Sequence, residues 1–285
     1  MRKAAPDEGL TVGMTVAFPR LDLEAAVAEV RSAGFEAVEV HLSQLGPGLP
    51  GVPVFERHAE TAGDLIRRAG LVVSTLNAVA DASFDPYGGA AAREATVQGL
   101  AHQLRLAAAM GAPRLLIYEG RVADAAAVRA ACETLASCLD RAARASRLAD
   151  PPVVSVECHP FTFGLQHRRL GELGAALRSV GAGICLDFCH FGVALGAELV
   201  HWVDDDVRTA LNHVHYADTD CVTSELHFPP GDGVLDLEAI GRRLAGSDVA
   251  IAWDLFGWPS PRQAMRDRMG VYQAFVTSHA AERGV

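Results

Sequence analysis

Short apolar runs alternate with longer amphipathic stretches along the whole chain. The short runs are rich in Val, Ile and Leu, which is typical of strands buried in a parallel sheet. The longer stretches place apolar residues at helical spacing and end near Gly or Pro. The predicted strands are residues 11–17, 37–42, 71–76, 114–118, 153–156, 184–186, 212–216 and 249–253. The predicted helices are residues 22–34, 56–69, 91–110, 123–148, 170–180, 197–210, 237–244 and 262–279.

This alternation predicts the fold class. A strand, a helix and a further strand favour parallel pairing, and eight such units favour closure into a single (β/α)₈ TIM barrel. An open doubly wound sheet is the structural alternative, but no glycine-rich dinucleotide fingerprint follows the first strand. No break in composition marks a linker, so we expect residues 1–10 to form an N-terminal tail and residues 11–285 one barrel domain. In such a barrel the active site lies at the C-terminal mouth of the strands.

Side chains that commonly bind metals stand at the ends of four consecutive predicted strands. They are Glu157, Asp187, His215 and Asp254. Because strand ends converge on one mouth of a barrel, we expect these groups to meet around a shared cation. Hard oxygen ligands and one imidazole favour Mn²⁺, with Mg²⁺, Co²⁺ or Zn²⁺ as alternatives. The alternative interpretation is a set of unrelated polar residues at loop starts, in which Asp187 only caps the next helix.

Other polar and aromatic residues lie near these strand ends. His213 and His215 share a face of the seventh strand, so only His215, nearer its C-terminal end, should reach a metal. We expect His213 one layer deeper, either as a substrate contact or as a hydrogen-bonded core residue. Trp253 precedes Asp254 and is predicted to line the mouth and contact the substrate; the alternative is a core position. Glu39 and His41 share one face of the second predicted strand.

Composition excludes several classes of function. The formal net charge is −10 and aromatic residues are only 6%, which disfavours a nucleic-acid partner. The six cysteines form no Cys-x-x-Cys pair and are expected to be reduced and buried, as in a cytoplasmic protein. We see neither a secretory signal nor an apolar run of about 18 residues, so no membrane contact is expected. The alanine-rich outer helices permit a homodimer.

Six segments occur in the order and spacing of a known family. They are residues 71–77 (LVVSTLN), 154–159 (VSVECH), 184–190 (ICLDFCH), 213–218 (HVHYAD), 230–235 (PGDGVL) and 251–255 (IAWDL). Together they resemble the xylose isomerase-like TIM barrel superfamily, in particular its sugar phosphate isomerase/epimerase branch, over nearly the full chain. The resemblance implies a metal held by the four strand-end residues listed above. It further implies that His190 contacts the substrate.

Two departures from the family pattern stand out. Asp254 occupies the position where the family usually has Glu, which withdraws the carboxylate by about one methylene, on the order of 1.5 Å. Ketose 3-epimerases of the family place an arginine six residues after the ligand histidine, and here that position is Cys221. His227 in the same loop is the predicted replacement as a substrate contact; the alternative is a solvated side chain.

The resemblance also implies a reaction. Glu157 and Asp254 would be the catalytic pair that moves a proton, while the metal polarises the substrate carbonyl and stabilises an enediolate. His159 and His190 would stabilise developing charge; for His159, packing of its loop is the alternative. Glu119, at the end of the fourth strand, is a further candidate acid or base, with an exposed loop position as the alternative. We expect a divalent-metal-dependent isomerase or epimerase of a sugar, cyclitol or related polyol.

Three other functions stay open at this point. A metal-dependent lyase or dehydratase, including elimination like that of C-glycoside deglycosidases, would use the same carboxylates. Phosphodiester hydrolysis, as in AP endonucleases of the superfamily, is disfavoured by the net charge. A degenerate, non-enzymatic barrel is supported only by the change to Asp254.

Overall fold

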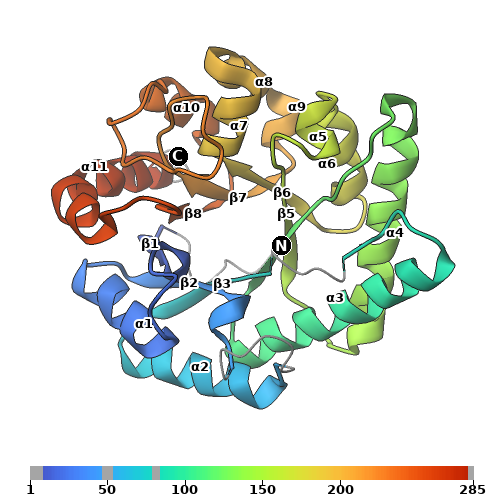
Figure 1. Ribbon diagram of the computed structural model, residues 1–285, viewed down its shortest axis with the longest axis horizontal. Coiled ribbons are helices and arrows are strands. Elements are labelled where there is room, and N and C mark those ends of the chain that lie inside the picture. The colour runs from blue at the N-terminus through green and yellow to red at the C-terminus, as the bar shows by residue number, and fades with distance from the viewer. Residues whose placement is uncertain (1–8, 47–53, 79–83, 282–285) are drawn as a thin grey trace.

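Eight parallel strands close into a barrel in chain order, and helices surround it (Figure 1). The computed structural model describes residues 9–46, 54–78 and 84–281, so most of the predicted tail lies outside the described residues. The strands are β1 Val12–Met14, β2 Ala37–His41, β3 Val72–Asn77, β4 Arg114–Tyr118, β5 Val153–Glu157, β6 Gly183–Asp187, β7 Leu211–Tyr216 and β8 Ala250–Trp253. The predicted (β/α)₈ barrel is confirmed.

The helices follow the predicted order with some changes. The α-helices are α1 Leu23–Ser32, α2 Glu56–Arg68, α3 Ala90–Met110, α4 Val128–Ser146, α5 Phe163–Gln166, α6 Leu170–Arg178, α7 Phe188–Leu195, α8 Leu199–Trp202, α9 Asp205–Arg208, α10 Leu237–Leu244 and α11 Pro261–Ala281. Short 3₁₀ turns are η1 Thr15–Ala17, η2 Leu42–Gln44, η3 Ala125–Ala127 and η4 Gly196–Glu198. The short α5 was not predicted.

Two predicted elements differ for local reasons. The first strand ends at Met14, because residues 15–17 turn into η1. The helix predicted over residues 197–210 is broken into η4, α8 and α9. Val203 leaves helical geometry, with φ −81° and ψ 61°, and Asp204 then begins α9 by accepting a hydrogen bond from the backbone N–H of Val207.

Alternation of side chains along the strands separates two environments. Outward-facing residues pack against the helices in one large hydrophobic core. A small second cluster inside the barrel consists of Val12, Met14, Ala37 and Ala252. The register pairs Glu157 with Cys185, Asp187 with His215, and His215 with Ala252. This register brings the ends of β5 to β8 to similar heights at the mouth.

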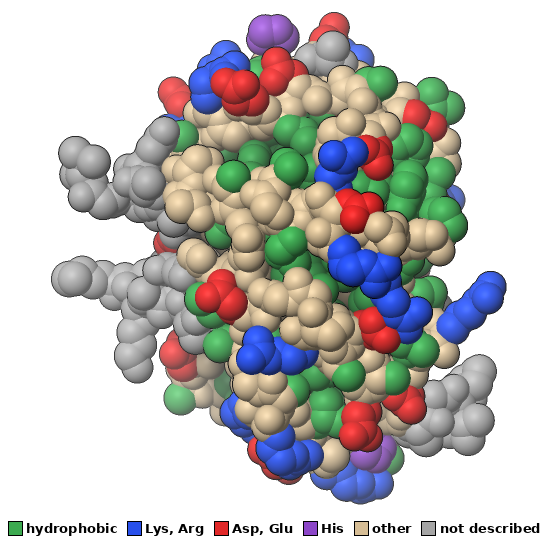
Figure 2. All heavy atoms as spheres, turned by 90° about the vertical axis from the view of Figure 1, so that its left-hand side faces the viewer, with side chains coloured by type: hydrophobic (Ala, Val, Ile, Leu, Met, Phe, Trp, Pro, Cys, Tyr) green, Lys and Arg blue, Asp and Glu red, His purple; other side chains and the backbone are tan. Residues whose placement is uncertain are grey.

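The outer surface carries charges of both signs. On the face that includes α10 and α11, basic and acidic side chains are interspersed rather than segregated (Figure 2). One pair on this side joins α11 to α1: the guanidinium of Arg262 donates to the carboxylate of Glu29 at 2.6 and 2.7 Å. Within the described residues, no helix combines the length and apolarity that a bilayer crossing requires.

Candidate metal centre

Asp187 combines two roles at the junction of β6 and α7. Its Oδ1 accepts a hydrogen bond of 2.8 Å from the backbone N–H of His190, so it caps α7. Its Oδ2 is buried without a hydrogen-bond partner and lies 3.4 Å from Nδ1 of His215. Asp187 therefore caps α7 with one carboxylate oxygen and directs the other at the candidate site.

Three carboxylates converge on one nitrogen of His215. Its Nδ1 lies 3.0 Å from Oε1 of Glu157, 3.4 Å from Oδ2 of Asp187 and 3.6 Å from Oδ2 of Asp254. A single N–H can satisfy only one of these oxygens. Ligand atoms about 2.0–2.1 Å from a cation lie roughly 3.0–3.4 Å from one another in tetrahedral or octahedral geometry. The residues present therefore fit a divalent cation.

These carboxylates are withdrawn from water. Glu157 and Asp254 are each 4% exposed, and Asp187 is fully buried. Burial alone would raise the pKa of Glu157, but the imidazoles of His215 and His159 beside it bring that pKa well below its usual value. Burial acts on Asp187 in the same way, and its histidine neighbours again lower the pKa. The site thus keeps negative charge at buried positions, which a cation would compensate.

His227 comes from the long loop between β7 and α10. Its Nδ1 lies 2.9 Å from Oδ2 of Asp254, but outside hydrogen-bond geometry. The loop is held by a hydrogen bond of 3.0 Å from the backbone N–H of His227 to the carbonyl of Phe256. His227 is 2% exposed, so the solvated alternative is wrong. Burial tends to lower the pKa of His227, yet Asp254 and Asp187 raise it well above the usual value.

Two further imidazoles lie on the Glu157 side of the site. The rings of His159 and His190 contact each other with centroids 4.1 Å apart and planes inclined by 32°. Nε2 of His159 is 3.5 Å from Oε2 of Glu157, and Nε2 of His190 is 3.9 Å from Oε1 of the same residue. Neither ring nitrogen of His159 has a hydrogen-bond partner within the described part of the chain. These rings are therefore available to groups that enter the site.

The structure corrects two predicted substrate contacts. His213 is fully buried, and its Nε2 lies 2.7 Å from Oε2 of Glu39, so it is a core residue beneath His215. Trp253 is also fully buried and packs against Phe35 and Tyr272, with ring centroids 5.9 and 5.2 Å away. Successive side chains of a strand face opposite sides, so Trp253 must face the helices when its neighbour faces the barrel interior.

Two buried carboxyl groups were not assigned correctly from the sequence. Glu39 is 1% exposed and contacts both histidines of β7. Its position inside an apolar strand was the available signal. Glu119 is fully buried rather than in an exposed loop; it accepts hydrogen bonds from the backbone N–H of Gly164 at 2.9 Å and from the Cys158 thiol at 3.1 Å. Burial raises the pKa of Glu119 to about 7.

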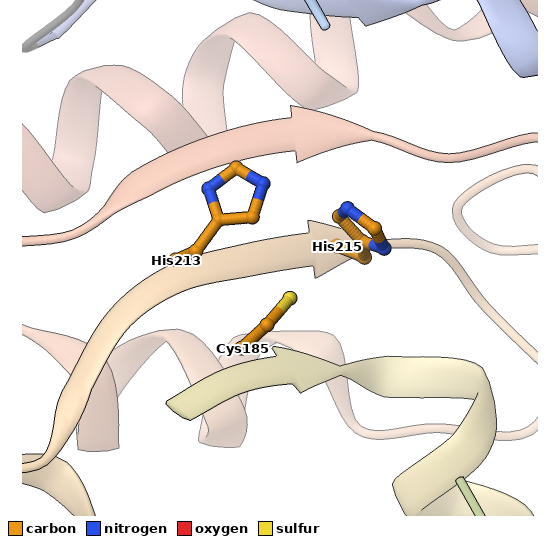
Figure 3. Close-up of side chains that lie close together, drawn as sticks. All are labelled: Cys185, His213 and His215. Carbon is orange, nitrogen blue, oxygen red and sulfur yellow. The ribbon is translucent and has the colours of Figure 1, made fainter. Parts of the chain in front are cut away.

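A thiol lies beneath the site. Cys185 on β6 points toward His213 and His215 of β7 (Figure 3), and one donor atom from each of the three residues lies within 4.8 Å of the others. Burial raises the pKa of Cys185 well above its usual value. Metals bind the thiolate form, so this cluster is a poorer cation site than the set of Glu157, Asp187 and His215, which meets the same distance criterion.

Comparisons with known proteins agree with this architecture. The family model described as xylose isomerase-like TIM barrel matches residues 27–271. A D-tagatose 3-epimerase-like protein has a TM-score of 0.71 at 16% identity, covering 94% of this chain and 98% of its own. The IOLI protein, solved with a zinc atom, has a TM-score of 0.69 at 14% identity, covering 97% and 100%. The probable 3-DHS dehydratase AsbF from Bacillus anthracis has a TM-score of 0.61 at 17% identity, covering 92% and 97%.

A search of curated proteins finds no match to the chain. At identities of 14–17% the three structures establish a shared fold and leave the reaction open.

Proposed function

The chain belongs to the xylose isomerase-like TIM barrel family, and from this premise we propose that it is a divalent-metal-dependent isomerase or epimerase of a sugar, cyclitol or related polyol. Glu157, Asp187, His215 and Asp254 would hold the cation. Their donor set favours Mn²⁺, with Mg²⁺, Co²⁺ or Zn²⁺ as alternatives. A bound cation would act as a Lewis acid on a carbonyl and its neighbouring hydroxyl.

The observation that carries the proposal is the approach of two carboxylates to one nitrogen from separate strands. Glu157 ends β5 and Asp254 follows β8, yet each has an oxygen within 3.6 Å of Nδ1 of His215. A polyol held there would have a carboxylate on either side. One carboxylate removes the proton from the carbon beside the carbonyl, and the C–H electron pair moves toward the carbonyl oxygen. In epimerisation the other returns a proton to the opposite face of the same carbon. In isomerisation the proton goes to the former carbonyl carbon, while the neighbouring hydroxyl gives up its proton and becomes the new carbonyl and the former carbonyl oxygen becomes a hydroxyl.

Three imidazoles supply the polar contacts that a polyol needs. Within the described structure, both ring nitrogens of His159 and of His227 lack hydrogen-bond partners. Nδ1 of His190 also lacks one. Nε2 of His190 lies 3.9 Å from Oδ2 of Asp187, and Nδ1 of His227 lies 4.0 Å from the same atom. A hydroxyl that enters between these rings gains partners without displacing existing hydrogen bonds.

Solvent exchange tests the proposal. The protein is incubated in D₂O with Mn²⁺ and a panel of ketoses, aldoses and inositol ketones, and loss of the C–H signal is followed by proton NMR. We expect exchange with at least one member, and its abolition by Glu157→Gln and Asp254→Asn. His201→Gln, at an exposed position of α8, is the matched control and should keep the wild-type rate. A metal-loaded protein that exchanges no panel member contradicts the proposal.

A lyase or dehydratase, including a C-glycoside deglycosidase-like enzyme, is the second candidate. The 2.9 Å contact between His227 and Asp254 favours it, because an imidazole paired with the base can protonate a departing hydroxyl or aglycone. Mass spectrometry of the products separates the two reactions, since elimination lowers the substrate mass and isomerisation preserves it. If elimination occurs, His227→Gln should slow it more strongly than it slows C–H exchange.

A further inference from the structure

Glu39 lies on β2, far along the chain from the histidines it contacts. Its Oε1 accepts a hydrogen bond of 2.8 Å from Nδ2 of Asn77 and lies 3.1 Å from Nε2 of His215. Its Oε2 lies 2.7 Å from Nε2 of His213. Glu39, His213 and His215 are each at most 1% exposed. The carboxylate is therefore held from three sides and reaches across the barrel interior from β2 to β7.

The two nitrogens of His215 face different partners. Nδ1 meets the cluster of carboxylates described above, whereas Nε2 meets only Glu39 among the ion pairs of the described residues. A neutral imidazole carries its proton on one nitrogen and a lone pair on the other. A proton on Nε2 can be donated to Glu39, which leaves the Nδ1 lone pair for a cation. The opposite tautomer would set a lone pair against a carboxylate and an N–H against the cation.

We propose that Glu39 is a positioning residue that fixes the tautomer and ring orientation of His215 for metal binding. This inference rests on the metal centre of the proposed function. Glu39 acts through His215 and does not touch the substrate. Asn77 and His213 in turn hold the carboxylate in place, which gives His213 a role in supporting Glu39. Carboxylates that orient ligand histidines typically raise metal affinity by about 10–100-fold.

The first test measures Zn²⁺ affinity by competition with a chromophoric chelator at pH 7.5. Glu39→Gln is expected to weaken binding by about 10–100-fold, because a neutral amide oxygen accepts the Nε2 proton more weakly than a carboxylate and no longer raises the basicity of the His215 ring. Glu119→Gln is the matched control: it also replaces a fully buried carboxyl at the same barrel, but its hydrogen-bond partners are Cys158 and Gly164. Its Zn²⁺ affinity should stay within a factor of about two of wild type.

The second test does not depend on a variant that folds. In ¹⁵N-labelled wild type loaded with Zn²⁺, long-range ¹H–¹⁵N correlations should place the His215 proton on Nε2 and the metal on Nδ1. Three results would each overturn the inference. Glu39→Gln could bind Zn²⁺ as tightly as wild type, or Glu39→Gln and Glu119→Gln could lose the same amount of Zn²⁺ affinity. The third result is a proton on Nδ1 of His215 in the Zn²⁺-loaded protein.

Neither test needs a substrate. A protein that binds Zn²⁺ with the expected tautomer but exchanges no polyol contradicts the proposed function and leaves the role of Glu39 intact. A protein that exchanges a polyol while Glu39→Gln binds Zn²⁺ normally contradicts the role of Glu39 alone. A wild type that binds no divalent cation contradicts both.

Discussion

Glu119 provides a pH-dependent test of how the barrel tolerates buried charge. It is fully buried at the end of β4. Burial raises its pKa from 4.5 to about 7, despite the hydrogen bonds from the Cys158 thiol and the backbone N–H of Gly164 that lower it. The folded state therefore holds this proton more tightly than the unfolded chain does. We predict that Glu119→Gln makes the protein more stable than wild type at alkaline pH.

The sign follows from proton linkage. Below about pH 4.5 Glu119 is protonated in both states and has no pH-dependent effect. As pH rises from about 4.5 to 7 the unfolded chain releases the proton while the folded state retains it, so wild-type stability falls. Above pH 7 the loss is complete. A pKa difference of about 2.5, at about 1.4 kcal/mol for each pKa unit, corresponds to roughly 3 kcal/mol.

Urea unfolding of both proteins from pH 4.5 to 8.5, in the presence of a chelator, measures this quantity. Gln never ionises, and its carbonyl still accepts from the backbone N–H of Gly164. A fixed offset between the two proteins at pH 4.5 does not affect the test, because the quantity measured is the growth of their stability difference, which should reach roughly 3 kcal/mol by pH 8. The titrations of other groups are common to both proteins and cancel. Stability curves that run parallel over this range would refute the reasoning.

Three further substitutions test the site and its surroundings. Asp187→Asn keeps a good capping residue, so metal-free stability should change by less than about 1 kcal/mol, while Zn²⁺ affinity by calorimetry should fall at least about 100-fold. Trp253→Ala should cost about 3–5 kcal/mol in urea unfolding; a matching loss of Zn²⁺ affinity would contradict its core position. Gly257→Ala should cost at least about 1–3 kcal/mol, because φ is +74° and the new Cβ would lie 2.2 Å from the carbonyl oxygen of Glu225. Thermal unfolding of Gly257→Ala measures this effect, and a melting temperature equal to that of wild type would exclude the strain.

Periodicity was sufficient to predict the barrel, because eight strand–helix units have few ways to bury their apolar faces. It was insufficient where one residue overrides the local pattern. The helix predicted over residues 197–210 reads as continuous, yet the capping side chain of Asp204 begins a new helix within it. The early end of β1 at Met14 is similar: Thr15 and Val16 are β-branched residues that favour strands, and the 3₁₀ turn over residues 15–17 depends on tertiary context.

Some residues of the candidate site could likewise be predicted from the sequence, and others could not. Strand ends are visible in the sequence, so the convergence of Glu157, Asp187, His215 and Asp254 could be anticipated from topology. Glu39 could not be assigned a partner, because the histidines it contacts lie 174 and 176 positions away. No local pattern encodes such a distant pairing.

The sequence contains the information needed to place Trp253, but not the information needed to place Glu119. The outward position of Trp253 follows from alternation once its neighbour Asp254 is taken to face inward, so the sequence held that answer. The burial of Glu119 did not follow from any pattern. It depends on Gly164, where an added Cβ would lie 2.6 Å from the Glu119 carboxylate, and this facing residue belongs to the unpredicted helix α5.

The barrel interior places polar groups in successive layers, each of which satisfies the next. Asn77 and His213 hold Glu39, Glu39 holds His215, and His215 meets the strand-end carboxylates. Taking charged groups out of water costs several kcal/mol for each ion even where partners surround it, so we do not expect such a stack for stability alone. Apolar residues of similar volume would make a more stable interior and no site. The layers that contradict ordinary strand patterning therefore lead to the strand ends where Glu157, Asp187 and Asp254 each bring an oxygen within 3.6 Å of Nδ1 of His215.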